Sequence, residues 1–579
     1  MNTDKKDFYE LKKNLTTDRT HLTKVKVALL GDSVTQFLAQ AIVSYAIEYN
    51  FNFDLFEAEY AQIEKQIFDL KSKLYLHSPE FVILYNSSRS LLKRFYSISP
   101  QHRENFAVDT ARKLESILDT LNQNLTANVI VFNFIEEDDM VFGNYGNKVR
   151  SSFIYQIREL NIKLMELSQR YNNVLICDLN RITAEIGRVN SVEPKLYITS
   201  DMHLNLDILP EVAKNVCDII AAAKGNVKKC VIVDLDNTLW GGIVGDDGVE
   251  NLQIGQLGVG KAYTEFQQWL LELKKRGIIL AVCSKNTEDI AREPFLSHPD
   301  MILKLEDFAV FIANWENKVD NIITIQRILN IGFDSIVFID DNPFERNMVR
   351  QAIPGIIVPE MPQDPSEYLP YLKSLNLFET TVYTKEDNIR TLQYQQEAKR
   401  TLVQKMYSTE DEYLESLHML AKVETFNDFN IPRVAQLTQR SNQFNLRTIR
   451  YNAEEIKKMS ESESFLTFAF SLRDDYGDYG LTGIVILNKQ KSSVYFIDTF
   501  IMSCRVLNRT FEEFILNHIV NVAKNKGARE IIGEYLPTRK NSIVKDFYKN
   551  LGFLQKDNLW VLEVENYHKK KTFIKYEND

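Results

Sequence analysis

Two aspartates, Asp234 and Asp236, stand one residue apart directly after a short apolar run, 230–233. Such a run is typical of a strand that is buried on both faces of a parallel sheet. Because open α/β sheets bind ligands at the carboxyl ends of their strands, we expect both carboxylates to face a crevice. Two acids this close repel each other unless a divalent cation or a shared proton lies between them. The pattern favours the cation, with an acidic surface turn as the alternative.

Polar side chains also follow three later apolar runs. Taken singly, each has a purely structural explanation, such as a helix cap or a solvated lysine. Parallel strands bring their carboxyl ends to one edge of a sheet, so the set together predicts a single site there. The residues are Cys283 and Ser284 after 278–282, Lys318 after 308–312, and Asp340 and Asp341 after 336–339.

These positions resemble the four motifs of the haloacid dehalogenase (HAD) phosphatase superfamily, which opens on Asp-x-Asp-x-Thr. The longer string 234–248, Asp-Leu-Asp-Asn-Thr-Leu-Trp-Gly-Gly-Ile-Val-Gly-Asp-Asp-Gly, is similar to the FkbH-like branch, as is the amide-rich string 432–446. The resemblance covers about residues 20–565. It implies a glyceryl transferase/phosphatase that acts on 1,3-bisphosphoglycerate. The glyceryl group then passes as a thioester to the phosphopantetheine arm of an acyl carrier protein.

The resemblance also implies a role for each residue. Asp234 attacks phosphorus as the nucleophile, and Asp236 is the general acid and then the general base. Mg²⁺ is the implied cofactor, and Ser284 and Lys318 position and neutralise the phosphoryl group. The expected metal site comprises Asp234, Asp236, Asp340 and Asp341, with the main-chain carbonyl of Asp236 as one ligand. The expected substrate-binding residues are Thr238, Asn286, Arg505 and Arg509.

Capture of an acyl phosphate as a thioester requires a thiolate. Cys283 is our first candidate, because it neighbours the second motif and Lys285, a cation that would lower a thiol pKa. Cys504 is the second candidate. A cysteine that ends a buried strand is commonly inert packing, which leaves a core role for Cys283 open.

Residues 20–222 read as a parallel α/β unit whose first strand, 25–30, runs into Gly-Asp-Ser ending at Ser33. This block resembles the opening of the SGNH hydrolases. The resemblance makes Ser33 a nucleophile, Asn86 an oxyanion donor, and Asp201 and His203 its partners. The spacing Asp-x-His departs from the usual Asp-x-x-His. We therefore expect an SGNH-like (flavodoxin-like) fold without hydrolytic activity, with a simple strand–helix turn as the alternative.

The remaining chain divides by pattern into three parts: a HAD Rossmann-like domain at 228–362, a polar helical linker at 379–425 and an α+β domain at 426–570. The last resembles the GNAT acyltransferases, in which a loop before a helix cradles the phosphates of coenzyme A or pantetheine. Such a cradle favours glycine. Asn508 and Thr510 stand at those positions here, so a scaffold without that ligand is an equal alternative.

Composition restricts the function further. The chain of 579 residues exceeds what one core supports, and the fold class we predict is multidomain α/β. A net charge of −10 argues against a nucleic-acid-binding surface as the main function. Five cysteines without paired spacing indicate a reducing, cytoplasmic setting, and no apolar run has membrane-spanning length. A plain phosphatase of a small phosphometabolite and a non-catalytic scaffold that docks a carrier protein are the rival functions.

Overall fold

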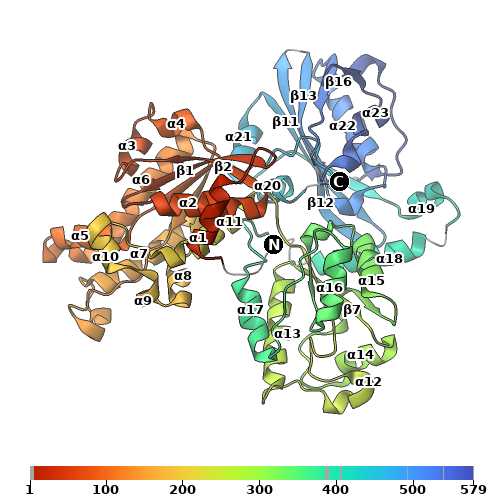
Figure 1. Ribbon diagram of the computed structural model, residues 1–579. Coiled ribbons are helices and arrows are strands. Elements are labelled where there is room, and N and C mark those ends of the chain that lie inside the picture. Colours follow the sequence, from red (N-terminus) through yellow and green to blue (C-terminus); the bar gives the residue numbers. More distant parts are fainter. Residues whose placement is uncertain are drawn as a thin grey trace. The chain divides into compact units, whose positions relative to one another are not determined.

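The computed structural model describes residues 6–384, 390–404, 407–441, 443–491, 493–538 and 540–577. The chain forms two compact units that divide between Ala223 and Lys224 (Figure 1). Both units combine helices with sheets, which confirms the predicted multidomain α/β class. Among the described residues, none of the helices combines the length and the apolar content needed to cross a membrane.

Unit 1 contains a five-stranded parallel sheet with the order β2-β1-β3-β4-β5. Its central strand β3 is apolar and buried at every residue, as expected for a strand covered on both faces. The strands are β1 (Thr23–Gly31), β2 (Phe51–Glu57), β3 (Phe81–Tyr85), β4 (Asn128–Phe132) and β5 (Val174–Cys177).

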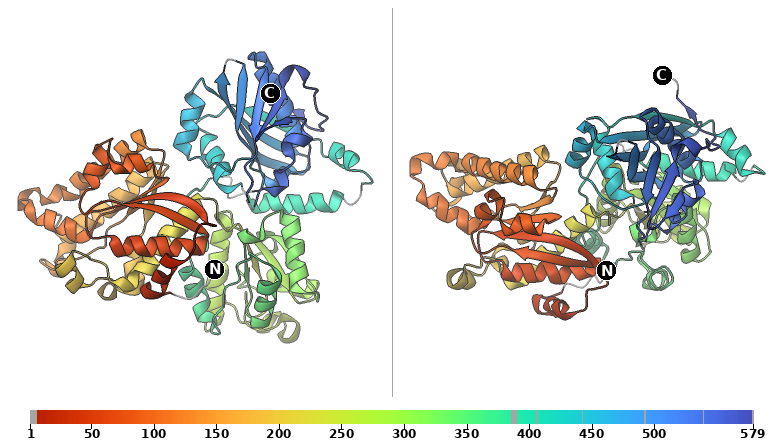
Figure 2. Two further views of the ribbon diagram at one scale, coloured as in Figure 1. Left: turned by 45° about the horizontal axis from the view of Figure 1, so that its top comes forward. Right: turned by 90° about the horizontal axis from the view of Figure 1, so that it is seen from above.

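Helices cover both faces of this sheet, and each face has its own apolar core (Figure 2). One face is covered by α1 (Phe8–Lys12), α2 (Gln36–Tyr45), α8 (Leu179–Ile186) and α11 (Leu209–Ala223). The other is covered by α3 (Ile63–Phe68), α4 (Lys73–His77), α5 (Ser88–Ser97), α6 (Phe106–Asn124) and α7 (Phe153–Arg170). Two short helices, α9 (Arg188–Ser191) and α10 (Pro194–Ser200), follow α8. Phe8 and Leu11 of α1 are buried in the first core, so the unit begins before the predicted residue 20.

Unit 2 begins with a four-stranded parallel sheet of order β8-β7-β6-β9. The strands are β6 (Cys230–Val233), β7 (Ile279–Ser284), β8 (Phe308–Ala313) and β9 (Ile336–Ile339). Strand β7 is longer than predicted, because its pairing with β8 continues to Ser284. One face is covered by α13 (Gly260–Lys275), α14 (Glu288–Ser297) and α17 (Tyr368–Ser374), and the other by α15 (Lys318–Leu329) and α16 (Pro343–Ala352). The short helix α12 (Val244–Asp247) follows β6.

The second sheet of unit 2 has eight strands in the order β15-β16-β14-β13-β12-β11-β10-β17. They are β10 (Leu420–Glu424), β11 (Phe465–Asp474), β12 (Gly477–Lys491), β13 (Val494–Met502), β14 (Glu530–Glu534), β15 (Leu554–Lys556), β16 (Leu559–Glu563) and β17 (Lys575–Tyr576). Helices α20 (Ile431–Arg440) and α21 (Ala453–Glu461) pack on one face. Helices α19 (Glu410–Ser416), α22 (Phe511–Asn525) and α23 (Phe547–Asn550) pack on the other.

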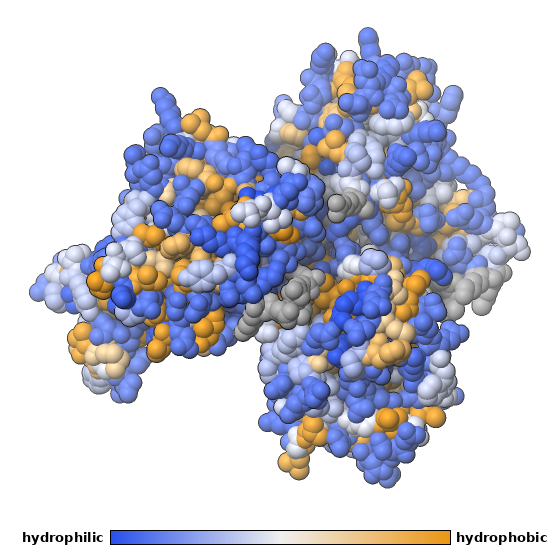
Figure 3. Space-filling model, in the orientation of Figure 1, coloured by the Kyte–Doolittle hydropathy of each residue, from blue (hydrophilic) through white to orange (hydrophobic). Residues whose placement is uncertain are grey.

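The predicted linker, 379–425, contains helices α18 (Arg390–Gln404) and α19, but also β10. Strand β10 pairs with β11, so the sheet reaches further towards the N-terminus than the predicted boundary at 426. On the face shown in Figure 3, hydrophilic residues predominate and apolar ones are scattered, as expected where the apolar side chains fill internal cores.

Candidate active site

The carboxyl ends of β6 and β9 meet at one edge of the first sheet of unit 2. The two strands pair in parallel with Val233 opposite Ile339, and the amide of Asp234 donates to the carbonyl of Ile339 at 3.0 Å. The next residue of each strand, Asp234 and Asp340, therefore stands at the same level. This arrangement follows from the parallel pairing that the sequence predicted.

Three carboxylates form the centre of the site. Oxygens of Asp234, Asp340 and Asp341 all lie within 4.8 Å of one another. Asp234 and Asp340 are buried, with 8% and 0% exposure. Burial, and then the charge of Asp234, raises the pKa of Asp340. Carboxylate oxygens gathered this closely are the ligands of a hard divalent cation, so these residues fit a metal site.

Lys318 links two of these acids. Its Nζ donates to Asp234 Oδ2 at 2.7 Å and to Asp340 Oδ2 at 2.5 Å, and its side chain is 3% exposed. Burial alone would lower the lysine pKa, but the two carboxylates raise it above its ordinary value. Asn317 caps the N-terminus of α15, which places Lys318 in the first turn of that helix. Lys318 therefore pairs directly with Asp234, the residue expected to be the nucleophile.

The carboxylate of Asp236 lies outside the three-carboxylate cluster, and the expected contribution of this residue to the metal site, its main-chain carbonyl, stays a prediction. Its carboxylate oxygens accept three hydrogen bonds: from Trp240 Nε1 at 2.9 Å, from the Val244 amide at 3.0 Å and from Asn286 Nδ2 at 3.1 Å. Burial raises the pKa of Asp236, and the amide of Val244 and the indole of Trp240 oppose that rise. A carboxyl group with a raised pKa, held in one orientation, suits proton transfer.

Two residues predicted to bind substrate, Thr238 and Asn286, contact the acids of the site. Thr238 is fully buried, and its hydroxyl lies 3.3 Å from Asp341 Oδ1 and accepts the Asp341 amide at 3.2 Å. Asn286 donates to Asp236. Arg346, which the sequence did not single out, donates through Nη1 to the carbonyls of Asp340 at 2.9 Å and Asp341 at 2.6 Å. These contacts hold the loop after β9 in place.

Ser284 and Cys283 end strand β7, beside β6. Ser284 lies at the carboxyl edge, as predicted, and is 1% exposed. Cys283 is fully buried in the core on the α15 face, with its Sγ 3.8 Å from the carbonyl oxygen of Lys318. Burial raises the pKa of this thiol, which disfavours the thiolate. The structure thus favours the core role for Cys283. The side chain of Cys504, the second candidate, lies outside the described residues.

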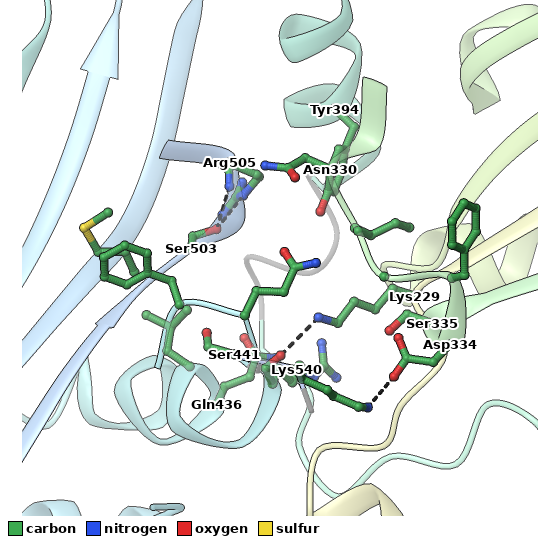
Figure 4. A pocket seen from close by; sticks show the side chains of 18 of the residues that line it. Lys229, Asn330, Asp334, Ser335, Tyr394, Gln436, Ser441, Ser503, Arg505 and Lys540 are labelled. Atoms are coloured by element: carbon green, nitrogen blue, oxygen red, sulfur yellow. Dashed lines mark hydrogen bonds and ion pairs between the residues drawn. The ribbon is translucent and has the colours of Figure 1, made fainter. Parts of the chain in front are cut away.

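The amide-rich string lies in another part of unit 2, where a cavity of about 790 Å³ is lined by Gln436, Ser503 and Arg505, among others (Figure 4). Lys229 and Ser335 line it too, and they precede β6 and β9. The cavity therefore lies at the amino edge of the first sheet. The four residues of β6, at about 3.3 Å each, separate it by about 13 Å from the carboxylate edge.

Arg505 and Arg509 were expected to bind a substrate phosphate, but their described contacts are with the protein. Arg505 Nε donates to Ser503 Oγ at 3.2 Å, and Nη1 donates to Gln393 of α18. Arg509 Nη2 donates to Glu397 of the same helix at 2.8 Å. Asn508 and Thr510, at the positions where glycine was expected, have φ values of 58° and 56°. The backbone conformation that favours glycine is therefore present without the glycines.

In unit 1, the serine hydrolase arrangement is incomplete. His203 Nε2 lies 2.7 Å from Glu137 Oε1, whereas the side chain of Asp201, the other residue named as a partner of Ser33, contacts Tyr60 and Lys93. Ser33 is 4% exposed, and in the described part of the chain no hydrogen bond joins it to His203.

Asn86 Nδ2, predicted to stabilise an oxyanion, donates to Asp32 at 3.3 Å. The expectation of a fold without hydrolytic activity stays a prediction.

Comparisons with known proteins match the two units of the chain separately. Residues 26–221 match the family model described as "FkbH, N-terminal domain". A search of the curated proteins finds no match. An acetyltransferase of the GNAT family from Staphylococcus aureus is 11% identical over 25% of this chain and 99% of its own, with a TM-score of 0.21. A likeness this weak carries no argument, so the GNAT resemblance of the C-terminal part stays a prediction.

A crystal structure of the N-terminal part of the protein BF1531 from Bacteroides fragilis, described as containing a phosphatase domain complexed with Mg, is far more similar. It is 51% identical, covers 65% of this chain and 99% of its own, and superposes with a TM-score of 0.62. The first unit thus matches the FkbH N-terminal domain model, and the chain belongs to the same family as BF1531.

Proposed function

We propose that this protein is a Mg²⁺-dependent phosphatase of the HAD type that acts on 1,3-bisphosphoglycerate and delivers its glyceryl group to an acyl carrier protein. The observation that carries the phosphatase part is the cluster of Asp234, Asp340 and Asp341, in which the ammonium of Lys318 pairs with the two buried members, Asp234 and Asp340. The relative BF1531 supports it, because its phosphatase domain was crystallised with Mg. The glyceryl part rests on the FkbH-like resemblance.

The residues present fit a magnesium ion. All the donors in the cluster are carboxylate oxygens, and three carboxylates with one ammonium leave a formal charge of −2. Mg²⁺ at Asp234, Asp340 and Asp341 would offset this charge and that of a phosphoryl group. Thr238 and Arg346 hold Asp341 and the main chain beside it, so the cluster is fixed by its surroundings.

The protein's own side chains account for phosphoryl transfer. One oxygen of Asp234 attacks phosphorus, an O–P bond to the aspartate forms, and the P–O bond to the leaving group breaks. Asp236 acts as the general acid, a role that the upward shift of its pKa by burial favours, and gives its proton to the leaving oxygen. Asp236 then takes a proton from a water molecule that attacks the aspartyl-phosphate, which releases phosphate and restores Asp234. Lys318 holds the Asp234 carboxylate in position throughout.

The thioester requires a different bond change. A thiolate attacks the acyl carbon of the acyl phosphate, a C–S bond forms, and the C–O bond breaks with phosphate as the leaving group. The ester phosphate at the other end of the substrate is left for Asp234. Because Cys283 is fully buried and its thiol pKa is raised, we propose the phosphopantetheine thiol of the carrier as the direct acceptor.

The test is incubation of the protein with Mg²⁺, 1,3-bisphosphoglycerate and a candidate carrier protein, followed by measurement of phosphate and by intact mass spectrometry. The proposal predicts phosphate release together with a glyceryl adduct on the carrier. Phosphate release without an adduct on any protein would indicate a plain phosphatase. Carrier binding without phosphate release would indicate a docking scaffold.

A further inference from the structure

Unit 1 has a cavity of about 470 Å³ that plays no part in the phosphatase chemistry. It lies where the loops after β1 and β3 leave the sheet, since Asp32 follows β1 and Asn86 follows β3. In the order β2-β1-β3-β4-β5, the chain continues from β1 to β2 on one side and from β3 to β4 on the other side. The two loops therefore diverge between these strands. This switch point is where open parallel sheets bind ligands.

Part of the cavity lining is apolar. It consists of side chains of α3, α5 and α6, the helices labelled in Figure 1, and of Phe134 after β4. The apolar lining residues are Ile63, Leu91, Leu114, Ile117 and Phe134. Neither Ser33 nor His203 lines the cavity. The cavity adjoins the incomplete hydrolase arrangement described above, because Asn86 lines it, but the serine and the histidine of that arrangement do not.

Arg94 gives the cavity its chemical character. Its guanidinium is half-buried, lies over the Phe106 ring at 5.0 Å and donates through Nη2 to Thr110. Among the described residues, no carboxylate forms an ion pair with Arg94, and burial lowers its pKa. A desolvated guanidinium that retains unused donors is matched by the planar oxygens of a carboxylate or by a phosphate.

The charges of Asp32 and Glu64 act on Arg94 and oppose the fall in its pKa, although among the described residues neither carboxylate forms an ion pair with it. Glu64 on α3 and Lys113 on α6 form an ion pair with each other at the cavity rim. Asp32 accepts hydrogen bonds from the Ser87 amide at 2.8 Å and from Asn86, so its charge is satisfied locally. Lys65 adds a second cation to the lining.

We propose that this cavity binds a small organic anion, with its carboxylate or phosphate on Arg94 and its carbon chain against Leu114, Ile117 and Phe134. The cavity volume is within the range of about 300–1,000 Å³ that is usual for small-molecule sites. The apolar wall excludes inorganic phosphate as the best ligand, because it would leave that surface uncovered. This site does not depend on the proposed phosphatase function.

Isothermal titration calorimetry of the full chain with hexanoate and with hexyl phosphate, both in EDTA, tests this site and distinguishes the two head groups. We expect at least one anion to bind about tenfold more tightly than 1-hexanol, because a hydrogen bond to a charged group contributes about 1.5–3 kcal/mol. Arg94→Gln should remove this advantage. Leu114→Phe should fill the cavity and weaken all three ligands.

Arg103→Gln is the matched control, because Arg103 lies over the Phe95 ring at 4.8 Å but does not line the cavity. It should leave binding unchanged, and thermal melts of each variant should show a folded protein. Absence of binding by both anions would overturn the proposal, as would equal losses in Arg94→Gln and Arg103→Gln. Binding that survives Arg94→Gln but disappears in Lys318→Met would place the anion in the phosphatase site and also overturn it.

Discussion

Replacement of Lys318 by Met tests how the buried acids are held together. Methionine keeps much of the side-chain volume but removes an ammonium that lies 2.7 Å from Asp234 and 2.5 Å from Asp340. The cluster would then carry a formal charge of −3 with no cation. Because breaking a buried ion pair leaves an uncompensated charge, we expect a loss of about 3–5 kcal/mol in stability without metal.

The assay is urea unfolding of wild type and Lys318→Met, once in EDTA and once in saturating Mg²⁺. A bound cation would take over the neutralising role of the lysine, so Mg²⁺ should restore most of the lost stability. Ligand at a hundred times its Kd stabilises a folded protein by about 3 kcal/mol. Phosphatase activity should still fall about 10²–10³-fold, because the lysine also compensates charge in the transition state.

Lys274→Met is the control. Lys274 forms an ion pair with Asp307, with 2.8 Å between Nζ and Oδ1, and this pair is not part of the site. That variant should lose less stability and respond no more strongly to Mg²⁺ than wild type. Equal losses in the two variants, together with full activity of Lys318→Met, would refute this account of the lysine.

Three further predictions concern single side chains. Trp240→Phe should lower kcat about tenfold and move the alkaline limb of the pH–rate profile to higher pH, because Asp236 loses a hydrogen-bond donor that favours its charged form. Trp269→Phe is the control, and an unshifted limb in Trp240→Phe would contradict this prediction. Burial and the charge of Glu513 raise the pKa of Glu512 to about 7, so the folded protein loses stability as the pH rises from 4.5 to 7. Glu512→Gln should therefore raise the melting temperature at pH 8 and not at pH 4. Identical shifts of the melting temperature at both pH values would contradict this prediction. Cys283→Ala should lower stability by about 1 kcal/mol and leave carrier loading within a few-fold, and loss of loading in the folded variant would restore Cys283 as the acyl carrier.

The sequence predicted the parts of the site that depend on strand ends. Apolar runs followed by Asp234, Ser284 and Asp340 indicated parallel strands, and the parallel pairing of β6, β7 and β9 brings those residues to one edge. Lys318 was predicted from its position after the apolar run 308–312, at the start of the helix that follows. The hydrophobic pattern predicts such positions, because it marks where each buried strand ends, and the carboxyl ends of parallel strands meet the crevice.

Side-chain partners could not be predicted, because they depend on turns and on contacts between distant segments. Asn286 and Trp240 orient Asp236 only because the chain reverses after β6, with Asn237 at a φ of 54°. Glu137, the partner of His203, lies in a loop after β4 that has no recognisable pattern. Strand β10, which lies between β11 and β17, was assigned to the linker, because a five-residue strand beside helical stretches gives a weak signal.

The phosphoaspartyl mechanism is the central claim, and Asp234→Asn tests it most directly. Wild type and variant would be mixed with Mg²⁺ and 1,3-bisphosphoglycerate, quenched in acid and mapped by peptide mass spectrometry while phosphate release is followed. We predict a phosphoryl group on the peptide that contains Asp234 in wild type. The variant should carry no such group and should release phosphate at least about 10³-fold more slowly, because an amide is no nucleophile. Release within a few-fold of wild type, with no phosphoryl group on Asp234 in either protein, would contradict the mechanism.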